Sequence, residues 1–248
     1  MYKKKHQLLE RFFLKFPKVS NILYKYLLNN KLGKFLKVFQ SENSIDYVYD
    51  IGAYKGEWSE FYRNTSLNKS KFILFEANKA HSSVLKRKNF TFFNVVLSDK
   101  KKDVEFFNNN NSTGDSYYKE NTFLQNNLDP IKLQTSTLDE VVQKNDLQKP
   151  HLIKIDTQGS EIDILKGSIN SIKNCKLIFL ECPMTNFNQN NLNIYDYIKY
   201  MKDIDYIPQE ICGIHHFHGY LVQLDLLFVK KDYYKNSNFD LKLLEQLF

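Results

Sequence analysis

Short apolar runs alternate with amphipathic stretches between residues 46 and 230. The apolar runs are rich in Ile, Leu, Val, Phe and Tyr and predict β-strands at residues 47–51, 71–76, 90–97, 151–156 and 176–181. The stretches between them carry apolar residues at helical spacing and predict helices near residues 56–63, 80–86, 137–142, 161–167 and 195–202. Regular alternation of strand and helix is typical of a largely parallel sheet with helices on both faces.

Two further apolar runs, at residues 206–211 and 221–230, predict a hairpin whose final strand is antiparallel to the other strands. Residues 104–107 predict a small additional strand, and the asparagine run at residues 108–111 predicts a loop. We therefore expect an α/β fold, a doubly wound, seven-stranded, mostly parallel, Rossmann-like sheet with an antiparallel final strand and an N-terminal helical arm.

The arm is the part of the chain that carries its basic character. Residues 1–40 hold ten Lys or Arg and one acidic residue, whereas the rest holds 25 basic and 27 acidic residues. Apolar residues recur at helical spacing through this stretch, which predicts an amphipathic arm at residues 1–45 followed by one domain at residues 46–248. One interpretation packs the arm on the domain or on a second subunit, giving a homo-oligomer. The other attaches it to an anionic membrane surface at the inner face of the membrane.

Composition narrows the class of protein. The 42% hydrophobic content supports a folded core, and no run of about 18 apolar residues predicts a membrane span. The three cysteines show no CxxC spacing, which argues against a disulfide framework or a thiolate zinc site and favours a cytoplasmic location. The near-neutral charge of the body argues against nucleic acid as a partner.

Ligands of open α/β sheets bind beyond the carboxyl ends of the strands, so the residues at those ends are the candidates for a binding site. The first strand ends at Asp50 and continues into a turn with Gly52 and Gly56, where a ligand can approach the backbone closely. The second strand ends at Glu76, an acid suited to bind ribose hydroxyls. The third ends at Ser98 and Asp99, which suit an adenine amino group. Together these residues predict a nucleoside pocket.

More charged side chains follow the remaining strands. Lys154 and Asp156 are two residues apart and share a face of the fourth strand, and Glu181 ends the fifth. An antiparallel final strand brings Asp225 and the histidine cluster at residues 215–218 to the same rim. Paired structural carboxylates are the alternative interpretation of Glu181 and Asp225. Three close histidines suit a metal, but surface histidines more often bind none, so we predict no metal site.

Six segments, in order along the chain, resemble the FkbM-type branch of the class I methyltransferases. They are Val48–Gly56, Phe75–Glu76 with Ala77 where the family often has Pro, Leu97–Asp99, Thr137–Glu140, Ile153–Glu161 with Ile164–Gly167, and Gln223–Val229. The segment Ile153–Glu161, read Ile-Lys-Ile-Asp-Thr-Gln-Gly-Ser-Glu, is the most specific. The resemblance covers residues 46–230 and leaves the basic arm outside it.

The resemblance implies S-adenosylmethionine as the cofactor and a sugar hydroxyl as the methyl acceptor, in a glycan, a glycoside or a nucleotide sugar. The cofactor-binding residues it implies are Asp50, Gly52, Ala53, Gly56, Glu76, Ala77, Ser98, Asp99 and Asp156. We expect Asp156 to be the catalytic base, Lys154 to orient it, and His216 or a neighbouring histidine to be the alternative base. The expected substrate residues are Ser116, Tyr117, Gln158, Glu181, His215, His218 and Asp225, the first two in a loop at residues 112–118 that resembles the family's substrate-facing loop.

Three alternatives stay open on the residues alone. Asp156, Glu181 and Asp225 suit a Mg²⁺-assisted methyl transfer, since that ion prefers oxygen ligands. A nucleoside-binding module without catalysis, acting in glycan assembly, would keep the same pocket. A dinucleotide oxidoreductase is weakened by the lack of a GxGxxG motif.

Overall fold

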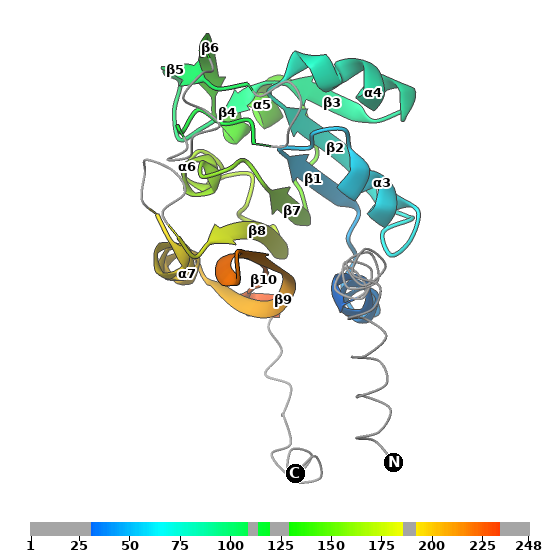
Figure 1. Ribbon diagram of the computed structural model, residues 1–248. Helices are drawn as coiled ribbons and strands as arrows, with labels where there is room; N and C mark the ends of the chain where they lie inside the picture. Colours follow the sequence, from blue (N-terminus) through cyan, green and yellow to red (C-terminus); the bar gives the residue numbers. More distant parts are fainter. Residues whose placement is uncertain (1–30, 109–113, 120–128, 186–191, 234–248) are drawn as a thin grey trace, which may run out of the picture.

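The computed structural model describes residues 31–108, 114–119, 129–185 and 192–233. Its main feature is a seven-stranded sheet in the order β3-β2-β1-β7-β8-β10-β9 (Figure 1). Neighbours from β3 to β8 pair in parallel, and β10 is antiparallel to β8 and β9. These strands are β3 Thr91–Asn94, β2 Lys71–Glu76, β1 Tyr47–Ile51, β7 Leu152–Ile155, β8 Leu177–Pro183, β10 Tyr220–Lys230 and β9 Tyr206–Phe217. The expected doubly wound sheet with an antiparallel final strand is confirmed.

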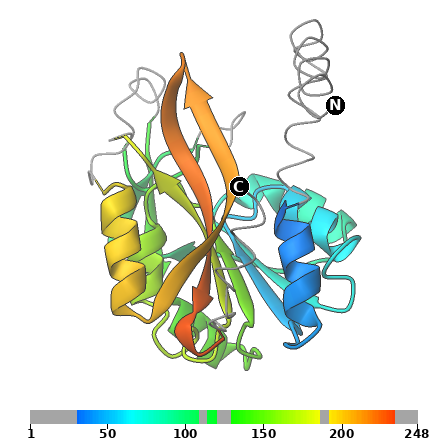
Figure 2. The same cartoon turned by 90° about the horizontal axis from the view of Figure 1, so that it is seen from below.

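Helices cover both faces of the sheet (Figure 2). One face packs against a helix at residues 31–40, α3 (Glu57–Arg63) and α4 (Ser82–Arg87), and the other against α5 (Leu138–Lys144), α6 (Glu161–Lys166) and α7 (Ile194–Asp203). Two separate apolar clusters, one on each face, result from this arrangement. Burial on both sides explains why the central strands read as nearly continuous apolar runs.

The register of the central strands places the acids at one edge of the sheet. Asp50 of β1 lies opposite Leu74 of β2 and Lys154 of β7. Glu181 of β8 lies opposite Asp225 of β10. Because the parallel strands share a direction, the residues that follow their carboxyl ends converge there.

The predicted strand at residues 90–97 is in fact two strands in different sheets. β3 ends at Asn94, and β4 (Val96–Leu97) pairs instead with β6 (Ile131–Ser136). β6 also pairs with β5 (Asp103–Phe106), which gives a second sheet in the order β4-β6-β5. β6 was not predicted from the sequence because most of its residues are polar or exposed.

The C-terminal hairpin is longer than the sequence indicated. β9 ends at Phe217 and β10 begins at Tyr220, and these two residues pair directly at the tip. Three register shifts interrupt the pairing, consistent with β-bulges that twist the ribbon. The hairpin projects beyond the other strands on the side of their carboxyl ends (Figure 2).

Part of the predicted arm packs on the domain. In the helix at residues 31–40, Leu32, Leu36 and Phe39 are buried in the same cluster as Val48 and Tyr62. The arm's first 30 residues lie outside the described residues. No helix in the described part of the chain is long and apolar enough to cross a membrane.

Candidate active site

A first cavity opens beyond the carboxyl ends of β1 and β2. Gly52, Tyr54, Glu76 and Ala77 line it near these strand ends. Its apolar lining residues are Phe75, Val95, Val96, Leu97, Phe106 and Ile164. Asp156, Thr157 and Ser160 come from the segment after β7, and Asp115, Ser116 and Tyr117 from residues 114–119. The cavity therefore combines polar and apolar lining residues, as a nucleoside ligand requires.

Gly52 lets the turns after β1 and β7 approach each other. Its φ of 72° lies in the left-handed region, and a Cβ there would lie 1.8 Å from the backbone oxygen of Asp156. Any side chain would force the two turns apart. Gly56 also has a positive φ, but a Cβ there would meet Leu85, Phe90 and Leu74, so its role is packing.

Glu76 is a buried residue whose carboxylate lines this cavity. Its two oxygens accept the backbone N–H groups of Tyr54 at 2.6 Å and Asn78 at 2.8 Å. Burial raises the pKa of Glu76 to about 7, although both N–H groups favour the ionised form. The carboxylate is thus held rigidly, with its charge sensitive to pH near neutrality.

Two other titratable side chains lie near Glu76. Glu76, His81 and Asp115 each have a potential ligand atom within 4.8 Å of the others, and among the described residues this is the one group compact enough for a metal ion. Asp115 accepts a hydrogen bond from the side chain of Asn78 at 2.8 Å. The carboxylates of the magnesium alternative, Asp156, Glu181 and Asp225, do not form such a group in the described part of the chain.

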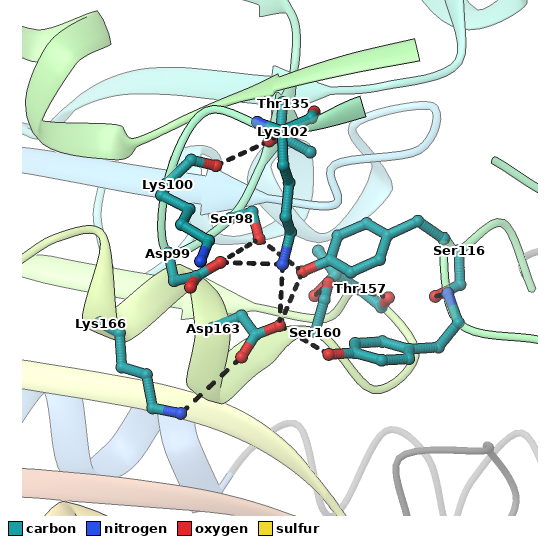
Figure 3. Close-up of polar contacts among 12 residues, drawn as sticks. Ser98, Asp99, Lys100, Lys102, Ser116, Thr135, Thr157, Ser160, Asp163 and Lys166 are labelled. Atoms are coloured by element: carbon teal, nitrogen blue, oxygen red, sulfur yellow. Dashed lines mark hydrogen bonds and ion pairs between the residues drawn. The ribbon is translucent and has the colours of Figure 1, made fainter. Parts of the chain in front are cut away.

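Tyr117 is held against the first cavity by a polar network. Its hydroxyl lies 3.0 Å from Ser98 Oγ and 3.2 Å from the Asp163 carboxylate, which also accepts the hydroxyl of Tyr118 at 2.6 Å. Lys102 lies between Asp99, at 2.8 Å, and Asp163, at 3.8 Å (Figure 3). Ser98 and Asp99 therefore bind Tyr117 and Lys102, and neither lines the cavity.

Lys154 is a buried cation that lies between two carboxylates at the carboxyl end of β7. Its ammonium group lies 3.1 Å from Asp50, 3.3 Å from Asp156 and 3.0 Å from the backbone oxygen of Gly52. Burial opposes its charge, but the two carboxylates more than offset this and raise its pKa. Asp50 is fully buried and also accepts a hydrogen bond from Ser59 at 2.6 Å. Lys154 and Asp50 thus form a buried pair that supports Asp156.

A second cavity lies on the opposite face of the strand ends and shares Asp156 with the first. Its other lining residues are Leu32, Trp58, Tyr62, Lys154, Phe179, Glu181, Cys212, His215 and Asp225. Glu181 accepts hydrogen bonds from the side-chain amides of Gln158 and Gln223. Burial, with Asp156 close by, raises the pKa of Glu181, whereas Lys154 outweighs burial and lowers the pKa of Asp156. Asp156 is therefore the ionised partner at the junction of the cavities.

His215 is the histidine that reaches the second cavity. Its Nε2 lies 3.0 Å from the carboxylate of Asp225. Gly213 pairs with Asp225 across the strands, and a Cβ there would lie 2.0 Å from the Asp225 carboxylate and 2.9 Å from His215 Nε2. Glycine thus leaves the space in which the pair meets.

The turn between β7 and α6 is fixed by a buried acid that the sequence analysis missed. Glu161 accepts hydrogen bonds from the backbone of Thr157 at 2.9 Å and of Gly159 at 3.0 Å, and from the hydroxyl of Tyr197 at 2.6 Å. The turn includes Gln158 at φ 56°. Glu161 therefore holds the backbone that carries Asp156 into both cavities.

The structure separates the predicted site residues into groups. Of the cofactor residues, Gly52, Glu76, Ala77 and Asp156 line the first cavity, whereas Asp50, Ala53, Gly56, Ser98 and Asp99 do not. Of the substrate residues, Glu181, His215 and Asp225 line the second cavity, and Gln158 contacts Glu181. Ser116 and Tyr117 line the first cavity instead, with Ser116 buried and bonded to the Gln158 carbonyl at 3.0 Å.

Two of the predicted histidines lie outside the cavities. His216 points to the face of β9 opposite His215, because neighbouring strand residues alternate, and lines neither cavity. His218 lies at the tip of the hairpin with φ 49°. The apolar lining residues, such as Trp58 and Phe179, carried no sequence signal that distinguishes them from core residues.

The chain matches a known protein family over most of its length. The family model described as "Methyltransferase FkbM domain" matches residues 50–220, more than half of the chain. The hexuronic acid methyltransferase AglP of Haloferax volcanii is 29% identical over 51 residues, which is 21% of this chain and 21% of that protein.

Two solved structures are similar in fold. The crystal structure of methyltransferase FkbM from Methylobacillus flagellatus has a TM-score of 0.48 and 16% identity, covering 75% of this chain and 43% of that chain. Magnesium protoporphyrin IX methyltransferase from Synechocystis, with bound S-adenosylmethionine, has a TM-score of 0.47 and 10% identity, covering 86% and 82%. Both TM-scores lie below 0.5, so neither similarity bears on the substrate. The chain spans less than half of the first structure and about a fifth of the curated relative.

Proposed function

Because the chain belongs to the FkbM family of S-adenosylmethionine-dependent methyltransferases, we propose that it is an O-methyltransferase acting on a sugar hydroxyl. The observation that carries this proposal is that the first and second cavities share the wall formed by Asp156. A methyl donor in one cavity and an acceptor in the other would meet at that residue. The similarity to a hexuronic acid methyltransferase supports a sugar acceptor.

The residues of the first cavity fit the cofactor. Glu76 offers a buried, rigidly held acceptor for the ribose hydroxyls. Phe75, Leu97 and Ile164 offer an apolar slot for the adenine ring, and bare backbone at Gly52 admits the methionine part. When bound, S-adenosylmethionine supplies an electrophilic methyl group on a positively charged sulfur. The ionised carboxylate of Asp156 would stabilise the positive charge on that sulfur.

We assign the role of base to His215. Its Nε2 lies 3.0 Å from the carboxylate of Asp225, and a carboxylate partner of this kind orients an imidazole ring for proton transfer. Asp156 is a weaker base because Lys154 lowers its pKa. With the cofactor held in the first cavity, its sulfonium group would supply the methyl group to the acceptor oxygen and would leave as the thioether, while His215 would accept the hydroxyl proton.

Mass spectrometry tests this proposal. The full chain is incubated with S-adenosylmethionine and a panel of free sugars, glycosides, nucleotide sugars and oligosaccharides. We expect S-adenosylhomocysteine to form together with a sugar product 14 Da heavier, retained after mild base, which cleaves methyl esters but not methyl ethers. Cofactor binding without any methylated sugar would contradict a sugar acceptor, and a base-labile product would contradict transfer to a hydroxyl.

A further inference from the structure

The tip of the β9–β10 hairpin exposes aromatic rings and carries no formal charge. Phe217 is 63% exposed and Tyr220 is 76% exposed. No residue from 211 to 224 is Asp, Glu, Lys or Arg, although such residues make up 25% of the chain. Natural proteins usually place charges on exposed edge strands to prevent association, so an uncharged aromatic edge indicates a binding surface.

This surface continues directly from the second cavity. Gly213, His215 and Phe217 are alternate residues of β9 and share one face, and Tyr220 lies directly opposite Phe217. The same face carries Asp225, which pairs with Gly213 and with Glu181 of β8. Alternate side chains of β9 therefore lead from the cavity wall at His215 to the aromatic tip. The hairpin itself extends past the carboxyl ends of the other strands (Figure 2).

The second cavity is built for an acceptor without negative charge. Asp156, Glu181 and Asp225 line it, and Lys154 is the one Lys or Arg among its described lining residues. That ammonium group already pairs with the carboxylates of Asp50 and Asp156 and donates to the Gly52 carbonyl, so its charge is largely balanced within the protein. A sugar carboxylate or phosphate here would lie near the ionised Asp156 carboxylate in a partly buried site, and the one lysine among the described lining residues is already paired with carboxylates.

We propose that the second cavity and the hairpin face together form the acceptor site for an uncharged oligosaccharide. The cavity binds the sugar unit that is methylated, and Phe217 and Tyr220 stack on the C–H face of a further unit. Exposed aromatic rings suit this role because they bind apolar ring faces while leaving sugar hydroxyls in water. The inference rests on the proposed sugar methylation, narrows its acceptor to a neutral glycan, and disfavours nucleotide sugars and hexuronates.

Glycan binding by the full chain tests the inference. The protein, saturated with S-adenosylhomocysteine, is applied to an array of neutral oligosaccharides and their uronate-containing and phosphorylated counterparts, and the strongest glycan is then titrated by calorimetry. We expect neutral glycans of two or more units to bind best. The double variant Phe217→Ala/Tyr220→Ala should bind the chosen glycan about tenfold more weakly, with unchanged affinity for S-adenosylhomocysteine. Tyr195→Ala, which removes an aromatic ring 80% exposed on α7, is the matched control and should have no effect.

Several results would overturn the inference. They are strongest binding to uronate or phosphorylated glycans, no binding to any glycan, or unchanged affinity in the double variant. Flotation with liposomes of mixed neutral and anionic lipid, lost in the double variant, would assign the aromatic tip to a membrane surface instead. Methylation restricted to an acidic sugar would overturn this inference and leave the proposed function standing. Absence of any methylated sugar would overturn both.

Discussion

The imidazole Nε2 of His215 lies 3.0 Å from the carboxylate of Asp225, in a space that exists because residue 213 is glycine. The carboxylate orients a ring that lines the second cavity. A histidine supported in this way is the arrangement expected of a general base, and the neighbouring histidine on β9 lacks access to either cavity.

Substitution of adjacent histidines distinguishes the two candidate bases. His215→Asn should lower kcat by a factor of about 10²–10⁴, because the acceptor proton loses its base. His216→Asn makes the same chemical change on the opposite face of the strand and should lower kcat far less. Steady-state kinetics with saturating cofactor measure both. Equal losses in the two variants, or a loss confined to His216→Asn, would move the base away from His215.

Cofactor affinity should depend on pH through Glu76. Its pKa is about 7 in the cofactor-free protein, and the ribose hydroxyls require the ionised form as acceptor. Binding therefore releases a proton below that pH, and the affinity for S-adenosylmethionine should be about tenfold higher at pH 8 than at pH 6. Calorimetric titrations across this range measure the effect.

The control for this experiment is Glu76→Gln, which is similar in size but does not ionise. It should bind the cofactor more weakly at pH 8 and lose the added pH dependence. Titration of the ligand's own amino group affects both proteins alike and cancels in the comparison. Identical pH profiles in the two proteins would remove Glu76 from the ribose site.

Alanine substitutions at two glycines with similar backbone conformations distinguish the effect of backbone strain from that of steric collision. Gly52 and Gly219 have φ values of 72° and 83°. A Cβ at Gly52 meets the backbone of Asp156, whereas one at Gly219 meets nothing within 4 Å. Gly219→Ala should therefore cost about 1 kcal/mol of stability through the left-handed conformation alone. Gly52→Ala should cost more and also weaken cofactor binding. Thermal unfolding and cofactor titration check both, and equal behaviour of the two variants would contradict the close approach at Gly52.

The hydroxyl of Tyr197 should stabilise the turn that carries Asp156. It donates to Glu161 at 2.6 Å inside the core, so Tyr197→Phe leaves a buried carboxyl group without one donor. We expect a loss of about 1–3 kcal/mol in the free energy of unfolding, measured by urea denaturation. Tyr195→Phe, two residues away but largely exposed, should change it by less than about 0.5 kcal/mol. An unchanged free energy of unfolding in Tyr197→Phe would show that the backbone hydrogen bonds to Glu161 are enough to stabilise the turn.

The sequence predicted those elements that are buried in the core, because burial requires a recognisable run of apolar residues. β1, β2 and β7 are buried on both faces and read as apolar runs, so their bounds were nearly correct. β6 was not predicted because four of its six residues are polar and Thr135 alone among them is buried. The break after Asn94 was missed because both halves of the predicted strand are apolar, although they join different sheets.

The sequence predicted the site residues that directly follow the ends of strands. Glu76 and Asp156 follow strands directly, and the parallel sheet brings them to one edge. Contacts between distant segments were not visible, such as Tyr117 bonded to Ser98 and Asp163. Residue type also does not show whether an acid lines the cavity. Asp50 does not line it and instead forms an ion pair with Lys154.

A crystal structure of the full chain with S-adenosylhomocysteine tests the central claim most directly, that methyl donor and acceptor meet at Asp156. We predict that the adenosine occupies the first cavity with its ribose hydroxyls on Glu76, and that the sulfur lies at the wall formed by Asp156 and faces the second cavity. Adenosine bound in the second cavity, or a sulfur directed away from Asp156, would contradict the account.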